Sequence, residues 1–148
     1  MQRRAKYWRR HDTRTDAGIR RVRASVDRAL RDVLGAFKMK PHIYISGPMT
    51  GMPELNFPAF HEAARLLRDA GYTVTNPAEL DEQDAGKTLT WEQYMRRDIA
   101  ALMQCDGIAT LTGWSNSRGA TLEVDIATRL SMPNWPVHTW LAMQAQRA

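Results

Sequence analysis

Short apolar segments alternate with amphipathic segments through most of this chain, and this alternation restricts the fold more than any other feature. Four apolar stretches of strand length are expected, at residues 41–46, 72–75, 107–111 and 137–141. Between them, apolar residues recur every three or four positions, the spacing of a helix that buries one face. Strands separated by helices favour right-handed crossovers and a parallel sheet. We therefore predict an α/β fold, a small doubly wound (flavodoxin- or Rossmann-like) sheet of four to five parallel strands with helices on both faces.

Capping residues predict where the helices of this body begin. Asn56 is a plausible N-cap, and Thr90 with Gln93 fits a capping box. The helices expected in the body span residues 56–69, 90–103 and 119–130, and residues 78–89 are expected to form a polar loop.

A basic segment precedes the body. Residues 1–38 carry twelve Lys and Arg against four Asp, a net charge of +8, whereas residues 39–148 carry a net charge of −3. We predict two parts, a basic N-terminal arm with an amphipathic helix at residues 1–38 and an α/β domain at residues 39–148. The apolar stripe expected on the helix over residues 16–37 consists of Ile19, Val22, Val26, Leu30, Val33, Leu34 and Phe37.

Three roles stay open for this helix. It could pack its stripe on the body or on a second subunit, bind nucleic acid or an acidic surface through its arginines, or be an extension of little function. Nucleic acid is expected as a partner only through this arm, because the body is mildly acidic. No run approaches the length of a membrane span, so no membrane partner is expected. The single cysteine, Cys105, reads as a buried inert thiol, and with no apolar signal segment at the start it favours a cytoplasmic location.

The stretch from Ser117 to Glu123 is the most suggestive local pattern. It follows the third expected strand and reads as a small-residue loop and a helix with a carboxylate about one turn inside. Backbone N–H groups at a helix start attract anions, so this loop suits a phosphate. It is equally compatible with an ordinary strand-to-helix turn. The loops at residues 47–51 and 112–119 should lie at the carboxyl edge of the sheet, where ligands of such folds bind.

Several common catalytic signatures are missing. The stretch Gly86-Lys87-Thr88 lacks the P-loop glycine at position 81, and the loop after the first strand lacks dinucleotide-binding glycine spacing. Four scattered histidines and one cysteine show no ligand spacing, so neither a metal nor a cofactor is predicted. Tyr44, Asp98 and Glu123 remain as groups that could converge, although each taken singly is more commonly structural.

Several motifs within residues 41–131 carry a family resemblance. They are Tyr44-Ile-Ser-Gly-Pro-Met-Thr-Gly51, Asn56-Phe-Pro58, Asn76-Pro77, Asp98, Cys105-Asp106, Gly113-Trp114 and Ser117-x-Gly119-x-x-x-Glu123. This pattern resembles the nucleoside 2-deoxyribosyltransferase superfamily, with the 2'-deoxynucleoside 5'-phosphate N-hydrolases as the most similar functional group. It is closer still to DUF4406, a branch common in phages and prophages.

The resemblance implies a catalytic role for three side chains. Glu123 matches the nucleophile that attacks the anomeric carbon of the sugar. Asp98 matches the acid that assists departure of the base, and Tyr44 matches the hydroxyl that positions the nucleophile. This is the logic of a retaining glycosidase, in which one carboxylate attacks and a second group transfers the proton.

The resemblance also implies a substrate. The phosphate-binding residues would be Ser46, Gly47, Ser117, Arg118 and Gly119, and Trp114 would either stack on the base or cap the edge of the sheet. A neutral Ser117 beside Arg118 suits a phosphate dianion, whereas a carboxylate there would repel it.

These assignments favour hydrolysis, or deoxyribosyl transfer, of 2'-deoxynucleoside 5'-monophosphates in nucleotide metabolism. A non-catalytic nucleotide sensor that docks through its basic arm is the alternative. A homo-oligomer is expected, because relatives of this kind often complete their sites across a subunit interface.

Overall fold

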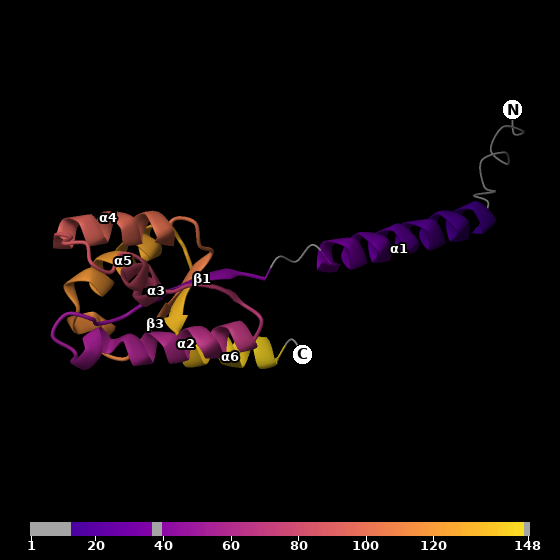
Figure 1. Ribbon diagram of the computed structural model, residues 1–148. Helices are drawn as coiled ribbons and strands as arrows, with labels where there is room; N and C mark the ends of the chain where they lie inside the picture. Colours follow the sequence, from indigo (N-terminus) through magenta and orange to yellow (C-terminus); the bar gives the residue numbers. More distant parts are fainter. Residues whose placement is uncertain (1–12, 37–39, 147–148) are drawn as a thin grey trace, which may run out of the picture. The chain divides into compact units, whose positions relative to one another are not determined.

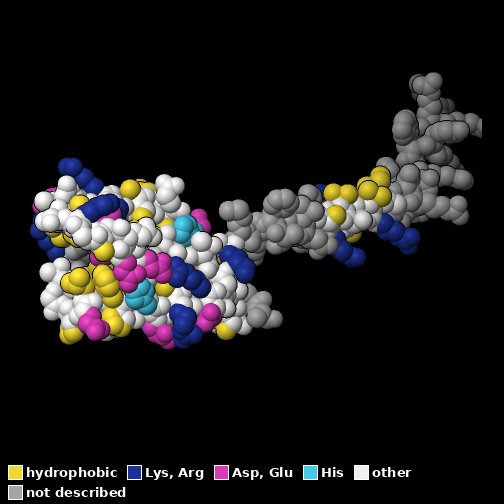
Figure 2. Space-filling view, in the orientation of Figure 1, with side chains coloured by type: hydrophobic (Ala, Val, Ile, Leu, Met, Phe, Trp, Pro, Cys, Tyr) yellow, Lys and Arg dark blue, Asp and Glu magenta, His cyan; other side chains and the backbone are white. Residues whose placement is uncertain are grey.

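The computed structural model describes residues 13–36 and 40–146, and the chain divides into two compact units, Met1–Met39 and Lys40–Ala148. The first unit contains helix α1 (Thr13–Ala36) (Figure 1). Ile19, Val22 and Val26 are 63%, 65% and 51% exposed, and Figure 2 shows apolar and basic side chains on different sides of this helix. The predicted stripe residues Leu30, Val33, Leu34 and Phe37 lie outside the residues whose side chains are described. Over the described ranges, none of the helices is both long enough and apolar enough to span a bilayer.

The second unit is built on a four-stranded sheet of order β2-β1-β3-β4, and every pair of neighbouring strands is parallel. This confirms the α/β fold predicted from the alternation of strands and helices. In this order β2 and β3 lie on opposite sides of β1, so the strand order reverses between β1 and β3. The strands are β1 (His42–Ser46), β2 (Thr73–Thr75), β3 (Gly107–Thr110) and β4 (Asn134–Pro136).

Helices cover both faces of this sheet. Figure 1 shows α4 and α5 on one side and α2 and α6 on the other. The helical elements of this unit are η1 (Pro53–Asn56), α2 (Phe57–Asp69), α3 (Pro77–Gln83), α4 (Trp91–Leu102), η2 (Trp114–Asn116), α5 (Arg118–Arg129) and α6 (Val137–Ala145).

Alternation along β1 decides which side chains meet which helices. Successive residues of a strand point to opposite faces of the sheet. Ile43 and Ile45 pack in one core cluster with residues of α2 and α6, whereas Tyr44 packs in a second cluster with residues of α4 and α5. Ser46 shares the face of Tyr44, two positions further along. The strand therefore presents two hydroxyl side chains to α4 and α5 at its carboxyl end.

One of the two predicted caps is confirmed, and the other is at the predicted position but makes no capping hydrogen bond. Thr90 and Gln93 form a complete capping box at the start of α4. Asn56 is the N-cap residue of α2, but its backbone is left-handed (φ 60°) and its side chain does not cap the helix. Instead, the Asn56 Nδ2 group donates a 2.9 Å hydrogen bond to the carbonyl of Pro48, which ties the loop after β1 to the start of α2.

Two predicted segments were wrong. Residues 137–141, predicted as the last strand, lie in helix α6, and the fourth strand occupies Asn134–Pro136 instead. The apolar residues Val137, Trp140 and Leu141 are spaced three and one apart, which suits one helix face, and all three belong to the α2-side cluster. Residues 78–89, predicted as a loop, begin with helix α3, whose start is capped by the side chain of Asn76.

Candidate active site

Glu123 lies on the buried face of α5. The helix begins after Ser117, whose Oγ accepts a 3.3 Å hydrogen bond from the backbone N–H of Ala120. Ala120, Val124 and Ala127 form its buried apolar stripe, and Glu123 falls on the same stripe with an exposure of only 5%. A carboxylate in such a position loses its hydration, so it must find hydrogen-bond donors within the protein.

Two hydroxyl groups from β1 supply these donors. The Tyr44 hydroxyl donates a 2.7 Å hydrogen bond to Oε1 of Glu123, and the Ser46 hydroxyl donates a 2.5 Å hydrogen bond to Oε2. Both donors are buried and come from alternate positions of one strand. Each carboxylate oxygen therefore has its own partner, and the plane of the carboxylate is held in a single orientation.

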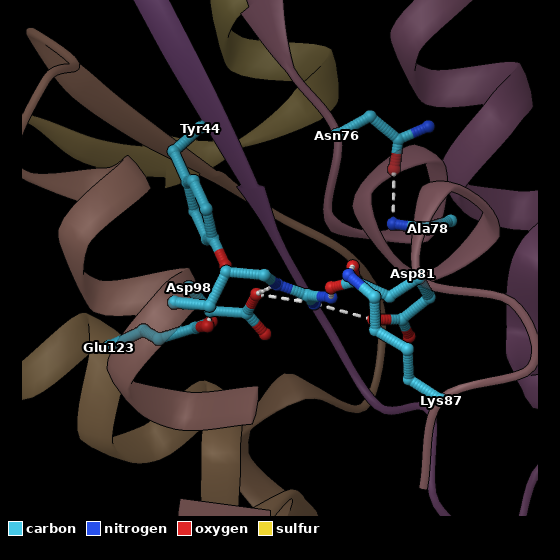
Figure 3. Close-up of polar contacts among 9 residues, drawn as sticks. Tyr44, Asn76, Ala78, Asp81, Lys87, Asp98 and Glu123 are labelled. Atoms are coloured by element: carbon cyan, nitrogen blue, oxygen red, sulfur yellow. Dashed lines mark hydrogen bonds and ion pairs between the residues drawn. The ribbon is translucent and has the colours of Figure 1, made fainter. Parts of the chain in front are cut away.

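A second carboxylate, Asp98, projects from the buried face of α4. Its Oδ1 atom accepts hydrogen bonds from Nε and Nη2 of Arg97, at 2.9 and 2.6 Å. Arg97 also pairs with Asp81 and Asp84, so its guanidinium joins three carboxylates (Figure 3). Among the described residues, none donates a hydrogen bond to Oδ2 of Asp98. This second oxygen is therefore available to a ligand.

Burial shifts the proton equilibria of this group. Desolvation raises the pKa of Glu123 to about 7, although the hydrogen bonds from Ser46 and Tyr44 oppose the shift, and the charge of Asp98 adds to it. Desolvation also raises the pKa of Asp98 to about 6, against the opposing effect of Arg97. The pKa of Tyr44 lies well above 10, mainly because of its burial, so its hydroxyl stays a donor. Two carboxyls that can each hold or release a proton near neutral pH are typical of a catalytic acid and nucleophile.

These carboxylates line one pocket at the carboxyl end of β1. Among the predicted residues, the pocket is lined by Gly47, Asp98, Ser117, Gly119 and Glu123. The structure therefore brings together segments that are far apart in the sequence, at the edge where the strand order reverses. Figure 2 shows apolar and acidic side chains gathered next to each other on the visible face of this unit.

Two of the predicted glycines lie where the chain packs closely. A Cβ atom on Gly47 would lie 2.8 Å from Cβ of Leu111, a distance that packed atoms do not adopt. A Cβ atom on Gly119 would lie 3.2 Å from Sδ of Met95, on the neighbouring helix α4. Gly47 thus lets β1 and the segment after β3 pack closely at the pocket, whereas a side chain at Gly119 would require only a small shift of Met95.

The other predicted residues lie elsewhere. Tyr44 and Ser46 do not line the pocket, but they lie behind Glu123 and hold it. Arg118 places its guanidinium carbon 3.6 Å from the ring centre of Trp91. Trp114 packs against the core cluster that contains Tyr44 and is not among the residues that line the pocket.

Three residues that line the pocket were not predicted from the sequence. Trp91 and Tyr94 line it from α4, and Asp81 lines it from α3. Trp91 and Tyr94 precede Asp98 by seven and four positions, so the expected helix already placed all three on one face. The position of Asp81 had no comparable signal, because it lies in a segment predicted to be a loop.

Comparison with protein families gives one match. The model of DUF4406, described as a domain of unknown function, matches residues 41–134, well over half of the chain. The match runs from the start of β1 into β4 and includes every residue of the site described above. A comparison with curated proteins gives no significant match.

Proposed function

The chain belongs to the DUF4406 family, and we propose that it cleaves the N-glycosidic bond of 2'-deoxynucleoside 5'-monophosphates, with Glu123 as the nucleophile. One observation carries this proposal. Glu123 is buried, hydrogen-bonded through both oxygens to Tyr44 and Ser46, and lines the same pocket as a second carboxylate, Asp98. A paired nucleophile and acid at one pocket is the minimum that retaining glycosidic chemistry requires.

The reaction follows from this arrangement in two steps. An oxygen of Glu123 attacks the anomeric carbon, the carbon–nitrogen bond to the base breaks, and a glycosyl ester forms. The departing base takes a proton from Asp98, through the Oδ2 atom that Arg97 leaves free. A water molecule then attacks the anomeric carbon and returns a proton to Asp98, which releases the sugar phosphate and restores Glu123. A second base in place of water gives deoxyribosyl transfer.

The first turn of α5 supports a 5'-phosphate on the substrate. Arg118 and Gly119 are the first two residues of the helix, and N–H groups at such positions have no carbonyl partner within it. Ser117 and Gly119 line the pocket, and neither carries a charge that would repel an anion. A phosphate at this helix start gains from the N–H groups and from the helix dipole.

The test incubates the protein with a panel of deoxynucleosides and their 5'-monophosphates and measures the release of free base by chromatography. Glu123→Gln should abolish the release while the protein stays folded. Asp125→Asn is the matched control, because it makes the same kind of change on the same helix, at an exposed carboxylate that pairs with Arg129. Base release that survives Glu123→Gln contradicts the mechanism, and a preference for unphosphorylated nucleosides contradicts the proposed substrate.

One contact favours a second function, a nucleotide-binding module without turnover. Arg97 holds Asp98 through two hydrogen bonds, and this cation favours the ionised form of Asp98, which cannot donate a proton. A binding module predicts that deoxynucleotides raise the melting temperature while no base is released. A homo-oligomer and docking through α1 stay predictions, and the mass of the protein in solution tests the first of them.

A further inference from the structure

One face of α4 supplies a wall of the pocket. Trp91, Tyr94, Met95 and Asp98 all line it. Their positions, separated by three, one and three residues, place them on a single face of the helix. With a rise of about 1.5 Å per residue, Tyr94 and Trp91 lie about 6 and about 10 Å from Asp98 along the helix axis. The proposed proton donor therefore stands at one end of a row that continues with two aromatic rings.

Each of these rings has an arginine against it. The guanidinium carbon of Arg118 lies 3.6 Å from the ring centre of Trp91, and that of Arg97 lies 5.2 Å from the ring centre of Tyr94. Arg97 is itself anchored by three carboxylates. A cation over an aromatic ring attracts it and so limits its movement. Only the opposite face and the edge of each ring are then left for a ligand.

Apolar side chains also line the pocket from elements other than α4. Met49, Leu55 and Phe60 contribute to it from the loop after β1, from η1 and from α2. A flat aromatic ligand in this pocket would meet these apolar side chains as well as the two rings of α4. An apolar and aromatic lining that also includes a carboxyl has the chemistry that suits a nucleobase as leaving group.

We propose that Trp91 and Tyr94 form the subsite that binds the nucleobase by stacking, an inference that rests on the function proposed above. A base in this row has its glycosidic end toward Asp98 and Glu123. Trp114, for which the sequence left open stacking on the base, packs against the core cluster that contains Tyr44 and is not among the residues that line the pocket. In this arrangement Arg118 links the start of α5 to the base subsite through its contact with Trp91.

The test separates recognition of the base from turnover. Binding of each 2'-deoxynucleoside 5'-monophosphate and of 2-deoxyribose 5-phosphate is measured by calorimetry, in the full-length protein with Glu123→Gln to prevent hydrolysis. In this background, Trp91→Leu and Tyr94→Leu should each weaken nucleotide binding about tenfold, the factor expected for loss of one base–aromatic stack. Binding of 2-deoxyribose 5-phosphate should not change, because this ligand has no base.

Two further variants complete the design. Trp91→Phe keeps an aromatic ring and should restore most of the nucleotide affinity. Arg96→Leu introduces the same residue at an exposed position of α4 and should change neither affinity. Thermal melting of each variant checks that the fold is retained.

The outcomes are distinct. Three results would overturn the base subsite. The first is undiminished nucleotide binding in both leucine variants, and the second is an equal loss of affinity for the nucleotide and for 2-deoxyribose 5-phosphate. The third is that the Glu123→Gln protein binds no nucleotide at all. Failure of the proposed function looks different, because the wild-type protein then releases no base while nucleotide binding still depends on Trp91 and Tyr94.

Discussion

The hydroxyl of Tyr44 donates a 2.7 Å hydrogen bond to Oε1 of Glu123, across 79 positions of the sequence. Ser46 makes the equivalent contact to Oε2 from the same strand. The pair of contacts turns a buried, unfavourable carboxylate into an oriented group at the end of a pocket. If Glu123 is the nucleophile, its reactivity depends on these two donors.

Removing the tyrosine hydroxyl tests this dependence. Tyr44→Phe deletes one donor to the ionised form of Glu123, so the pKa of Glu123 should rise further above about 7. Base release at pH 7 should fall by about tenfold or more, and the falling limb of the pH–rate profile, whose midpoint follows the higher pKa of the pair, should move to higher pH. Ser46→Ala should act in the same direction through the other oxygen. A lower rate with an unmoved pH profile would indicate a purely structural role for Tyr44.

The wild-type enzyme should show a bell-shaped pH dependence with its maximum between pH 6 and 7. Activity rises as Glu123, with a pKa of about 7, loses its proton, and falls as Asp98, with a pKa of about 6, loses the proton that the base needs. The active form is the pair carrying one proton, on Asp98. Because Glu123 has the higher pKa, most singly protonated pairs carry the proton on Glu123 instead, so the active form is a minority species that is most abundant between the two values. Initial rates of base release from pH 4.5 to 9 measure the profile. Asp98→Asn should remove the falling limb, and a profile that is flat from pH 5 to 8 contradicts the assignment.

The burial of Glu123 should also lower the stability of the folded protein at high pH. Its pKa in the folded protein, about 7, lies above the ordinary value of 4.5, so the folded state keeps a proton that the unfolded state has lost. Stability attributable to this group is complete below pH 4.5 and is lost as the pH rises through 7. Glu123→Gln should therefore be more stable than wild type at pH 8, by about 3 kcal/mol.

Urea unfolding at pH 4.5 and pH 8 measures this difference. The stability gain of Glu123→Gln should be small at pH 4.5, where the wild-type carboxyl is also neutral. Asp125→Asn, at an exposed position of the same helix, should show no such pH-dependent gain. An equal effect of Glu123→Gln at both pH values would mean that Glu123 does not titrate as described.

Arg97 should be far more important for stability than its neighbour Arg96. Arg97→Ala leaves Asp81, Asp84 and Asp98 close together without their shared cation, at partly buried positions. Loss of one partner from such a network costs about 3 kcal/mol. Arg96 is exposed, so Arg96→Ala should change the free energy of unfolding by less than about 0.5 kcal/mol.

The pH dependence of this loss provides a second check. The destabilisation by Arg97→Ala should be greater at pH 8, where Asp98, with a pKa of about 6, is ionised, than at pH 4, where Asp98 is protonated. Chemical unfolding at the two pH values measures it. Similar losses for Arg97→Ala and Arg96→Ala would show that the network contributes little.

Local sequence patterns were sufficient for much of the fold. The capping box of Thr90 and Gln93 was predicted because its two residues are only three positions apart, and the sheet was predicted from the period of its apolar residues. The last strand was misplaced because Val137, Trp140 and Leu141 are compatible with either a strand or a helix. Only packing against α2 and the sheet favours the helix.

The candidate site shows the same division. The sequence by itself determined that Tyr44 and Ser46 share a face of one strand and that Glu123 lies near the start of a helix, because these relations depend on residues a few positions apart. Only the tertiary structure decided that the three meet, that Arg97 joins Asp98 to Asp81 and Asp84, and that Trp91, rather than Trp114, lines the pocket. Those relations depend on which face of the sheet each helix covers and how closely it packs there. Contacts across many tens of residues leave no periodic pattern in a single sequence.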